Sequence, residues 1–500
     1  MVARAYTVAF LGVEARIVEV QCALSAGMPA FTVVGLPDKA VSEARERIRA
    51  ALTAMGLAMP SKRVTVNLSP ADLPKEGSHF DLPIALAVLG AMDAIPMEEV
   101  GRFVSLGELS LDASLVPVIG ALPAALAAAE AGHGLICPAT CGAEAAWVGA
   151  TQVLAAGSLL EVVNHFNGRM TIAPAVPGLV KDQRSCPDLR DVRGQERAKR
   201  ALEVAAAGRH HMLMVGAPGS GKSMLAKRLP GILPDLGPEE ALETSMIHSL
   251  AGLIEEGGIS RARPFQEPHH TASMAAIVGG GRRAGPGEVS LAHNGVLFMD
   301  EFPEFPRGVL ETLRQPVETG DVVVSRANAH VRYPCKFMLV AAANPCKCGF
   351  LADPARACAR VPGCGQDYLG RISGPLMDRF DIRIEVPPVA VEDLSLPPAE
   401  EGTAEVAARV AAARAVQAER FADIPGASTN SDVEGDALDS VAEATRDARE
   451  LLTRAASRYQ LTARGYHRIL RVARTIADLA ASPRIERTHA AEAVGYRLSF

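Results

Sequence analysis

The sequence predicts an α/β fold in which helices cover both faces of a parallel sheet, with another α/β region before it and a helical region after it. Residues 1–170 alternate β-branched stretches with Ala-rich stretches of helical character. Residues 190–388 carry continuous apolar runs, Met212–Val215, Val296–Met299 and Phe337–Ala343, which are typical of strands buried on both faces. Residues 389–500 look helical.

Length and composition limit the classes of protein to consider. A chain of 500 residues predicts about three domains. The net charge of −6 excludes a wholly basic nucleic-acid binder but says nothing about local patches. No stretch approaches 18 uninterrupted apolar residues, and Glu14 and Arg16 follow the weakly signal-like residues 5–13 at once. We therefore expect a cytoplasmic protein with no membrane contact.

Pro-punctuated residues 171–189 predict a linker between the first two regions. The helical region has an uneven charge, because residues 451–500 hold nine Arg against three acids while the residues before them are acidic. This pattern fits two solvated helix faces, or a basic face that meets a phosphate or an acidic neighbour.

The most specific motif follows the apolar run Met212–Val215 and precedes a helical stretch. It matches G-x-x-x-x-G-K-[ST] at every fixed position, with Gly216, Ala217, Pro218, Gly219, Ser220, Gly221, Lys222 and Ser223. The glycines allow backbone N–H groups to turn inward around a phosphate. Lys222 would reach the β- and γ-phosphates, and Ser223 would ligate Mg²⁺. A chance Gly-rich turn is the alternative, and the order strand, loop, helix disfavours it.

Two acids end the second apolar run. Asp300 would hold the Mg²⁺ shell, and Glu301 would orient and deprotonate an attacking water. On its own the pair could be a strand followed by a helix cap, but the phosphate loop before it favours a hydrolytic site. Asn344, at the tip of the third run, could position the same water or form a turn before Pro345. Arg379 could be an ordinary ion-paired Arg, or it could reach the γ-phosphate on a neighbouring subunit.

This order of motifs resembles the AAA+ ATPases, with the helical region as their lid. More narrowly, the chain resembles the magnesium-chelatase-like ComM/YifB family over essentially its whole length, on the segments Val34–Asp38, Leu73–Gly77, Asp191–Glu196, Glu267–His270, Gly287–Gly295 and Ser373–Asp381. The resemblance implies ATP and Mg²⁺ as cofactors. It also implies a ring, usually a hexamer, because in these ATPases an arginine of one subunit, called the arginine finger, acts on the nucleotide of its neighbour.

The resemblance also implies a role for each site residue. Lys222 and Ser223 occupy Walker A, and Asp300 and Glu301 occupy Walker B. Asn344 would be sensor 1, Arg379 the arginine finger, and Arg464 sensor 2. It divides the chain into a Lon-protease-like (ribosomal S5 domain 2-type) domain at 1–170, a linker at 171–189, a P-loop AAA+ core at 190–388 and a helical lid at 389–500.

A Lon-like domain raises the question of peptidase activity. A Ser–Lys dyad needs a hydroxyl nucleophile and a nearby Lys as its base. His79 stands at the position that matches the Lon nucleophile, and no Lys occurs between Glu76 and Val180. We therefore expect a non-proteolytic module for DNA, oligomer or partner contact.

Two segments suit loops that hold DNA. Residues 320–333 predict a hairpin that carries Arg326, His330 and Arg332, and residues 260–283 include Arg282 and Arg283. Basic residues on phosphates give affinity that depends on salt and not on base sequence. Each of them could instead be a solvated Arg, and the neighbouring His269–His270 could be a structural pair or ligands.

Nine cysteines in a long chain argue against a disulfide scaffold. Four of them, Cys346, Cys348, Cys358 and Cys364, lie within nineteen residues after Asn344. Four thiolates predict a structural Zn²⁺ site, although paired Cys ligands more often have two residues between them. Free reduced thiols are the alternative.

The leading hypothesis is a hexameric, Mg²⁺/ATP-driven helicase that acts on single-stranded or branched DNA, since the family resemblance implies branch migration in natural transformation. The alternative is a chelatase-like ATPase that remodels a protein or metal-insertion partner. A protease is disfavoured by the missing dyad.

Overall fold

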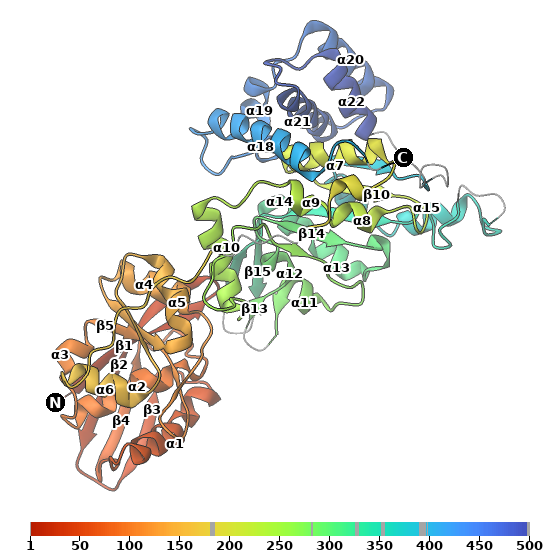
Figure 1. The fold of residues 1–500 in the computed structure, drawn as a ribbon. Helices are drawn as coiled ribbons and strands as arrows, with labels where there is room; N and C mark the ends of the chain where they lie inside the picture. The colour runs from red at the N-terminus through yellow and green to blue at the C-terminus, as the bar shows by residue number, and fades with distance from the viewer. Residues whose placement is uncertain are drawn as a thin grey trace.

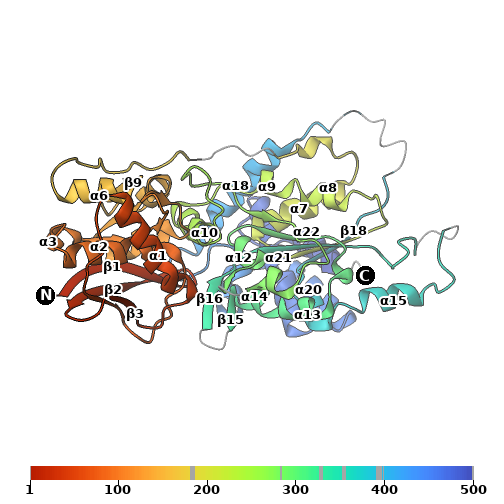
Figure 2. The same cartoon turned by 90° about the horizontal axis from the view of Figure 1, so that it is seen from below.

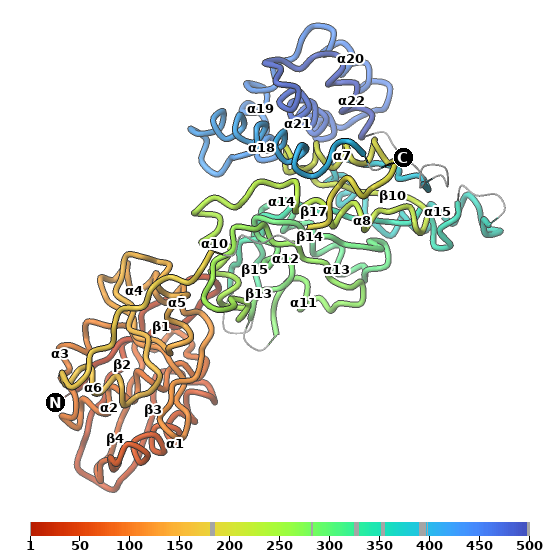
Figure 3. The backbone as a smooth tube through the Cα atoms, in the orientation of Figure 1, coloured from red at the N-terminus to blue at the C-terminus, as the bar shows by residue number. Residues whose placement is uncertain are grey.

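The computed structural model of the chain describes residues 2–180, 186–281, 284–325, 330–351, 356–389, 397 and 399–497. The predicted α/β character is confirmed. In Figure 1 the N-terminal sheet lies at one end, the second sheet in the middle and the last helices at the far end. The tube in Figure 3 shows the same succession without the ribbons. None of the helices in these ranges combines the length and apolar character that a bilayer crossing demands.

The N-terminal region is built on a seven-stranded mixed sheet with the order β3-β4-β2-β1-β5-β8-β9. Its long strands β1 and β2 form an antiparallel pair around a turn at Gly12. The strands are β1 (Val2–Leu11), β2 (Glu14–Ser25), β3 (Ala30–Val34), β4 (Arg63–Ser69), β5 (Phe103–Ser105), β8 (Gly134–Pro138) and β9 (Val153–Ala156), with a small hairpin of β6 (Glu108–Leu109) and β7 (Leu115–Val116).

Helices complete this region, and α2 is buried along nearly its whole length because its sequence is almost entirely apolar. The helices are α1 (Lys39–Ala54), α2 (Asp81–Ala91), α3 (Met97–Val100), α4 (Ala121–Glu130), α5 (Gly142–Ala145) and α6 (Leu159–Phe166). The N-terminus of α1 is capped by Asp38, whose carboxylate accepts from the Val41 N–H at 2.8 Å.

The middle region holds a five-stranded sheet with the order β11-β14-β17-β10-β18, and every pair in it is parallel. The strands are β10 (Met212–Val215), β11 (Phe265–Gln266), β14 (Val296–Met299), β17 (Met338–Ala343) and β18 (Ile382–Glu385). The three predicted apolar runs are therefore confirmed as the central strands, with the third beginning one residue later than expected.

Alternate residues of these strands enter different cores, which explains their continuous apolar character. Met212 and Met214 pack with α7 and the C-terminal helices, whereas Leu213 and Val215 pack with α11, α12 and α13. The helices of this region are α7 (Glu196–Gly208), α8 (Lys222–Ala226), α9 (Leu229–Ile232), α10 (Pro238–Leu250), α11 (Met274–Val278), α12 (Glu288–Leu291), α13 (Arg307–Thr312), α14 (Arg314–Thr319), α15 (Gly363–Leu369) and α16 (Gly374–Met377).

Two small hairpins extend from this region, formed by β12 (Gly279–Gly280) with β13 (Gly285–Pro286) and by β15 (Asp321–Ser325) with β16 (His330–Pro334). The second confirms the hairpin predicted for residues 320–333. The described C-terminal residues are mainly helical, in α18 (Thr403–Arg420), α19 (Gly435–Val441), α20 (Arg446–Arg458), α21 (Ala463–Leu479) and α22 (Arg487–Arg497).

The N-terminal region is docked on the middle region through specific contacts, and the view in Figure 2 shows the two regions side by side. The Trp147 indole N–H donates to Gly257 O at 2.9 Å. Ser249 of α10 donates to the carboxylate of Glu144, whose pKa burial raises. The turn at Gly12 lies against β16. The two regions therefore meet at both α10 and the β15–β16 hairpin.

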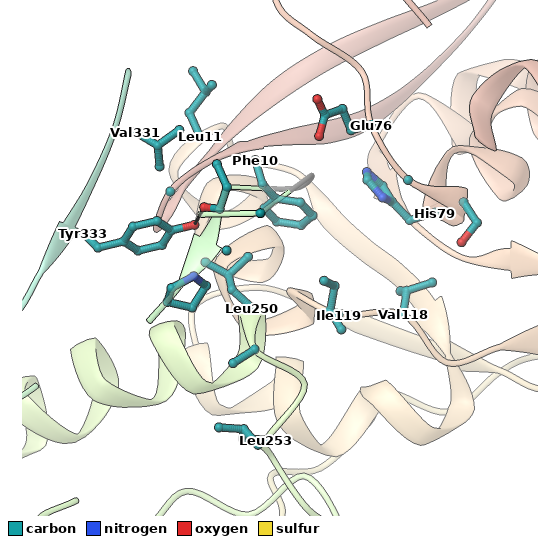
Figure 4. A pocket seen from close by; sticks show the side chains of 18 of the residues that line it. Phe10, Leu11, Glu76, His79, Val118, Ile119, Leu250, Leu253, Val331 and Tyr333 are labelled. Atoms are coloured by element: carbon teal, nitrogen blue, oxygen red, sulfur yellow. Dashed lines mark hydrogen bonds between the residues drawn. The ribbon is translucent and has the colours of Figure 1, made fainter. Parts of the chain in front are cut away.

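A cavity of about 1090 Å³ lies at this joint. Figure 4 shows Phe10, Glu76 and His79 of the N-terminal region facing Leu250 of α10 and Tyr333 of β16 across it. The Tyr333 hydroxyl donates to Ala284 O at 2.8 Å, which fixes the ring at the cavity wall.

Candidate nucleotide site

The predicted phosphate loop, residues 216–223, leads from β10 into α8 at the carboxyl edge of the parallel sheet, the edge where ligands bind in sheets of this kind. Gly219 and Gly221 have φ values of 78° and 92°, which residues other than glycine rarely adopt. At Gly216 a Cβ atom would lie 2.2 Å from Val386 O. The glycines of the motif are therefore required by the backbone path of the loop.

Lys222 points back into this loop. Its Nζ donates to Gly216 O at 2.8 Å, to Ala217 O at 3.0 Å and to Asn344 Oδ1 at 3.3 Å. Burial lowers the pKa of Lys222, and the charges of Asp300 and Glu301 oppose that shift. The predicted Walker A lysine, at the start of α8, and the predicted sensor 1 amide, directly after β17, thus lie together.

The acid pair lies next to the loop. The Ser223 hydroxyl donates to Asp300 Oδ2 at 2.6 Å, although 77 residues separate the two in the chain. Asp300 Oδ1 accepts from the Glu301 backbone N–H at 2.9 Å. Glu301 itself has a φ of 50°, a left-handed conformation that costs a residue with a side chain about 1–2 kcal/mol. Such strain concentrates at functional sites.

The Glu301 carboxylate has a partner that the sequence did not single out for it. His270 Nδ1 lies 3.3 Å from Glu301 Oε2, with the His270 side chain one-third exposed. The His269 ring packs on His270 with centroids 4.2 Å apart and planes tilted by 33°, and the Phe305 ring makes an edge-type contact with His270 at 6.5 Å between centroids. The only signal in the sequence is the adjacent His pair, which was expected to be structural, ligating or near DNA.

The residues present fit a nucleoside triphosphate with Mg²⁺. Ser220 Oγ is buried and has no hydrogen-bond partner among the described residues, so the loop keeps a polar atom available for a ligand. Ser223 and Asp300 offer hydroxyl and carboxylate oxygens, the donors that Mg²⁺ prefers. The arrangement can hold a triphosphate and a hard cation, and it can place a carboxylate near the terminal phosphate.

Arg379 lies far from this loop. It precedes β18, which runs parallel to β10 in the register Met212↔Ile382 to Val215↔Glu385, so Arg379 is at the amino edge of the sheet. A strand of this length spans about 13 Å. Arg379 is 8% exposed and forms an ion pair with Glu318 of α14, a partner that sequence reasoning missed.

The C-terminal helices fix the backbone around Arg379. Arg468 of α21 donates to Arg379 O at 2.9 Å and to Asp381 Oδ1 at 2.7 Å. Arg497 of α22 donates to Phe380 O at 2.6 Å. Arg464 is exposed in the first turn of α21, and no hydrogen bond or ion pair in the described structure joins it to the phosphate loop.

Asp381 lies in a buried charge cluster behind this segment. Burial alone would raise its pKa, but Arg468 and His210 hold the pKa of Asp381 well below the usual range. Burial lowers the pKa of the adjacent His211 to about 4, against the opposing charge of Asp381. His211 is also held by the Leu339 N–H, which donates to Nδ1 at 3.0 Å.

Of the residues considered for DNA contact, Arg326, Arg282 and Arg283 lie outside the described part of the chain. Arg332 is exposed on β16 and forms an ion pair with Asp321 across the hairpin. His330 is exposed at the start of β16. Two of the five predicted DNA-contact residues, His330 and Arg332, thus lie on the exposed face of one strand of this hairpin.

The cysteine loop lies over the phosphate loop, because a Cβ at Gly349 would come within 2.5 Å of Pro218 Cγ. Cys346 Sγ and Cys348 Sγ are 3.1 Å apart. Nevertheless, the described residues include no group of three or more His, Cys, Asp or Glu side chains that could hold a metal ion. The predicted zinc site at Cys346, Cys348, Cys358 and Cys364 is therefore not supported.

Ser78 and His79, the residues considered for peptidase activity, both have hydrogen-bond partners within the N-terminal region. Ser78 donates to the carboxylate of Glu108, and His79 Nε2 lies 2.9 Å from Val8 O. Lys75, the nearest Lys in the sequence, is fully buried with its Nζ on Pro70 O. Ser78 and His79 each have a partner other than one another, and both line the cavity of Figure 4.

Three family models match consecutive parts of the chain. The model "Subunit ChlI of Mg-chelatase" matches residues 18–141, "Magnesium chelatase, subunit ChlI" matches residues 188–394, and "Magnesium chelatase, subunit ChlI C-terminal" matches residues 400–497.

Individual proteins match over greater lengths. The chain is 43% identical to the competence protein ComM of Haemophilus influenzae, covering 98% of this chain and 96% of that protein. It is 41% identical to YifB of Escherichia coli, again over 98% of this chain and 96% of the relative. It is 26% identical to the magnesium-chelatase 38 kDa subunit of Rhodobacter capsulatus, over 39% of this chain and 54% of that subunit.

Proposed function

Because this chain belongs to the ComM/YifB family of magnesium-chelatase-like proteins, we propose that it is an AAA+ ATPase that works as a motor on DNA. The observation that carries the proposal is the meeting of Ser223 with Asp300, 2.6 Å apart, beside Lys222 at one edge of a parallel sheet. A hydrolytic nucleotide site needs this combination of a phosphate loop, a cation ligand and an adjacent acid.

In this proposal each side chain has one task. Lys222, whose Nζ donates to carbonyls of the loop, would bind the β- and γ-phosphates instead, while Ser223 and Asp300 would hold Mg²⁺. Mg²⁺ bound with ATP neutralises the charge that develops on the phosphates. Glu301 orients the attacking water and accepts its proton, and Asn344 positions the same water. Arg464, exposed in the first turn of α21, would contact the phosphates from the lid.

The proposed assembly is a ring, most simply a hexamer. Arg379 and the phosphate loop lie at opposite edges of one sheet, about 13 Å of strand apart. An Arg in that position cannot reach the nucleotide of its own subunit, but it can face the nucleotide of the next one. This geometry supports a finger that acts in trans.

For DNA, the β15–β16 hairpin is the proposed contact, with His330 and Arg332 on β16 and Arg326 in the connecting residues, and Arg282 and Arg283 as further contacts. Phosphate contacts of this kind give binding that is independent of base sequence, as a translocating motor requires. One of the similar proteins is a competence protein, ComM, which supports a role in natural transformation. The activity proposed within that role is branch migration of DNA during transformation or recombination.

The regions take the proposed assignments of a non-proteolytic Lon-like domain (1–170), a linker (171–189), an AAA+ core (190–388) and a helical lid (389–500). The engagement of Ser78 with Glu108 supports the absence of peptidase activity. A second candidate function is a chelatase-like ATPase that remodels a protein partner, because all three family models bear the name of a chelatase subunit. The short match to that subunit disfavours it.

The test is ATP hydrolysis with and without single-stranded or forked DNA, measured together with strand displacement. We expect Lys222→Ala and Glu301→Gln to lower the turnover about 10²-fold or more. Lys227→Ala, at the end of the same helix with an exposed side chain paired to Glu267, is the matched control and should remain active. Hydrolysis without any DNA binding, stimulation or unwinding would remove the helicase proposal and leave the ATPase proposal.

Action in trans has its own test. Subunits with Arg379→Ala and subunits with Glu301→Gln should each be inactive alone, but mixed rings should recover part of the hydrolysis, because some interfaces combine an intact finger with an intact acid. If no mixture recovers activity, the trans proposal is wrong.

A further inference from the structure

Arg379 is held by a carboxylate of its own chain. Its Nη2 forms an ion pair with Glu318 Oε2, and only 10% of the Arg379 side chain is exposed. Its Nε is buried without a hydrogen-bond partner among the described residues. The guanidinium is therefore only partly satisfied where it lies, which is unusual for a buried Arg.

Glu318 and a phosphate would compete for the same group. A guanidinium binds carboxylates and phosphates with the same forked geometry, so Arg379 cannot serve both at once. To reach a nucleotide on a neighbouring subunit, Arg379 must leave Glu318. The Glu318 side chain is 53% exposed, so the ion pair is accessible and can break without opening a core.

The side chain of Arg379 is the part free to move. Its carbonyl accepts from Arg468 at 2.9 Å, and the carbonyl of the next residue, Phe380, accepts from Arg497 at 2.6 Å. These contacts anchor the backbone to α21 and α22. A change of partner at Arg379 therefore involves its own rotamer or a movement of Glu318.

Glu318 is directly coupled to the hairpin. It lies in the last turn of α14, and β15 begins three residues later, at Asp321. The base of the hairpin is closed by Cys335 N–H, which donates to Gly320 O at 2.7 Å, and by the Asp321–Arg332 ion pair. A displacement of the hairpin is thus transmitted to the helix turn that carries Glu318.

We propose that Glu318 is a positioning residue that withholds Arg379 from the terminal phosphate on the neighbouring subunit until single-stranded DNA bears on the β15–β16 hairpin. This inference rests on the proposed function, in which Arg379 acts in trans. It adds a specific link between the DNA contact and ATP hydrolysis, since DNA that pulls on α14 would release the finger.

The experiment measures ATP hydrolysis by the full chain, with and without single-stranded DNA, for wild type, Glu318→Gln and Glu318→Asp. For Glu318→Gln we expect the DNA-free rate to rise about two- to fivefold, the change expected from losing one half-exposed ion pair. The rate at saturating DNA should stay unchanged, so the stimulation ratio falls. Glu318→Asp keeps the charge and should restore the wild-type ratio.

Two further variants make the result decisive. Glu311→Gln removes a neighbouring carboxylate that pairs with Arg314 and not with Arg379, and it should leave the ratio unchanged. The double variant Glu318→Gln with Arg379→Ala should show none of the gain. A loss of activity in Glu318→Gln, or an unchanged ratio, would overturn the inference. Normal hydrolysis in Arg379→Ala would instead refute the action of Arg379 in trans, the part of the proposed function on which the inference rests, and would leave the ATPase proposal standing.

Discussion

Glu301 combines two features that rarely meet in one residue, a left-handed backbone and an exposed carboxylate held by a histidine. Its φ is 50°, and His270 Nδ1 lies 3.3 Å from its Oε2. The left-handed backbone sets the direction in which the Glu301 side chain leaves the chain, and the contact with His270 holds the position of its carboxylate. Both effects reduce the freedom of the group proposed to activate water.

We predict that His270→Ala lowers the turnover for ATP about 10- to 100-fold with little change in nucleotide affinity, because a misplaced base costs rate and not binding. His269→Ala is the comparison and should have a smaller effect, since the His269 ring packs on His270 but its Nδ1 contacts Thr271 Oγ1 at 2.7 Å and not Glu301. Steady-state hydrolysis and a nucleotide-binding titration measure the two quantities. Equal effects of both variants would contradict the prediction.

Cys348 should be the most reactive of the four clustered thiols. A hydrogen bond with Cys346 lowers the pKa of Cys348 to about 6, so its thiolate predominates at pH 7. Alkylation by iodoacetamide, followed by mass spectrometry, should show half-maximal reactivity of Cys348 near pH 6. Cys346→Ala should move that midpoint upward. If the thiols resist alkylation until a chelator is added, a bound metal protects them and the prediction is wrong.

At the residue scale, the sequence predicted contiguous groups well and distant partners poorly. Lys222 and Ser223 lie in one motif, and Asp300 follows an apolar strand, so strand order alone brings them to one edge. The pairing of His270 with Glu301 and of Glu318 with Arg379 was missed because each partner lies on another element, and nothing in the local sequence identifies it. The spacing of the four cysteines resembles that of a zinc site, but spacing along the chain does not determine whether their sulfur atoms converge on one metal position.

At the scale of elements, the turn between β1 and β2 carries an unusual demand. Gly12 has a φ of 66°, and a Cβ there would lie 2.6 Å from Arg332 O and 2.9 Å from Val331 Cγ1. The turn therefore approaches the β15–β16 hairpin more closely than any side chain would allow. Val13, the next residue, packs against the core of the middle region.

We predict that Gly12→Ala loosens the docking of the N-terminal region. Gly56→Ala is the matched control, because Gly56 also has a positive φ, 74°, but no atom lies within 4 Å of its Cβ position. Both variants should lose about 1 kcal/mol for the backbone conformation. Only Gly12→Ala should also make residues 167–180 more sensitive to limited proteolysis by thermolysin. Equal sensitivity of the two variants would show that the contact does not hold the regions together.

The elements themselves were largely predictable. The central strands followed from uninterrupted apolar runs, since alternate residues enter two separate cores and neither face tolerates polar side chains. The short edge strand β11 could not be predicted, because Phe265–Gln266 has too few residues to show an alternation of apolar and polar side chains. The order of the seven-stranded sheet was also beyond the sequence, since it depends on long-range pairing such as that of β1 with β5.

At the scale of the whole molecule, a buried charge cluster joins the sheet to the C-terminal helices and should make stability depend on pH. Burial lowers the pKa of His211 to about 4, from 6.5 in the unfolded chain. As the pH falls below 6.5, the unfolded chain takes up a proton that the folded chain refuses, so the stabilising contribution is full above 6.5 and is lost toward pH 4.

We predict a loss of up to about 3 kcal/mol in the free energy of unfolding between pH 6.5 and pH 4 from this one group. His211→Gln, which keeps a hydrogen-bond acceptor near the Leu339 N–H, should flatten the dependence in that window. Below pH 4, protonation of Asp381 should destabilise both proteins, since the pKa of Asp381 is held well below its usual range. Urea unfolding at a series of pH values measures this, and an unchanged slope in the variant would contradict it.

The position of Arg379 at the amino edge of the sheet and of the phosphate loop at the carboxyl edge has a consequence for stoichiometry. If Arg379 works in trans, each subunit supplies the phosphate loop of one site and the Arg379 of a neighbouring site. A single subunit therefore completes neither site. An open row of subunits always leaves one site incomplete, whereas a closed ring completes all of them. Activity per subunit should therefore rise steeply with protein concentration and then become constant once rings close.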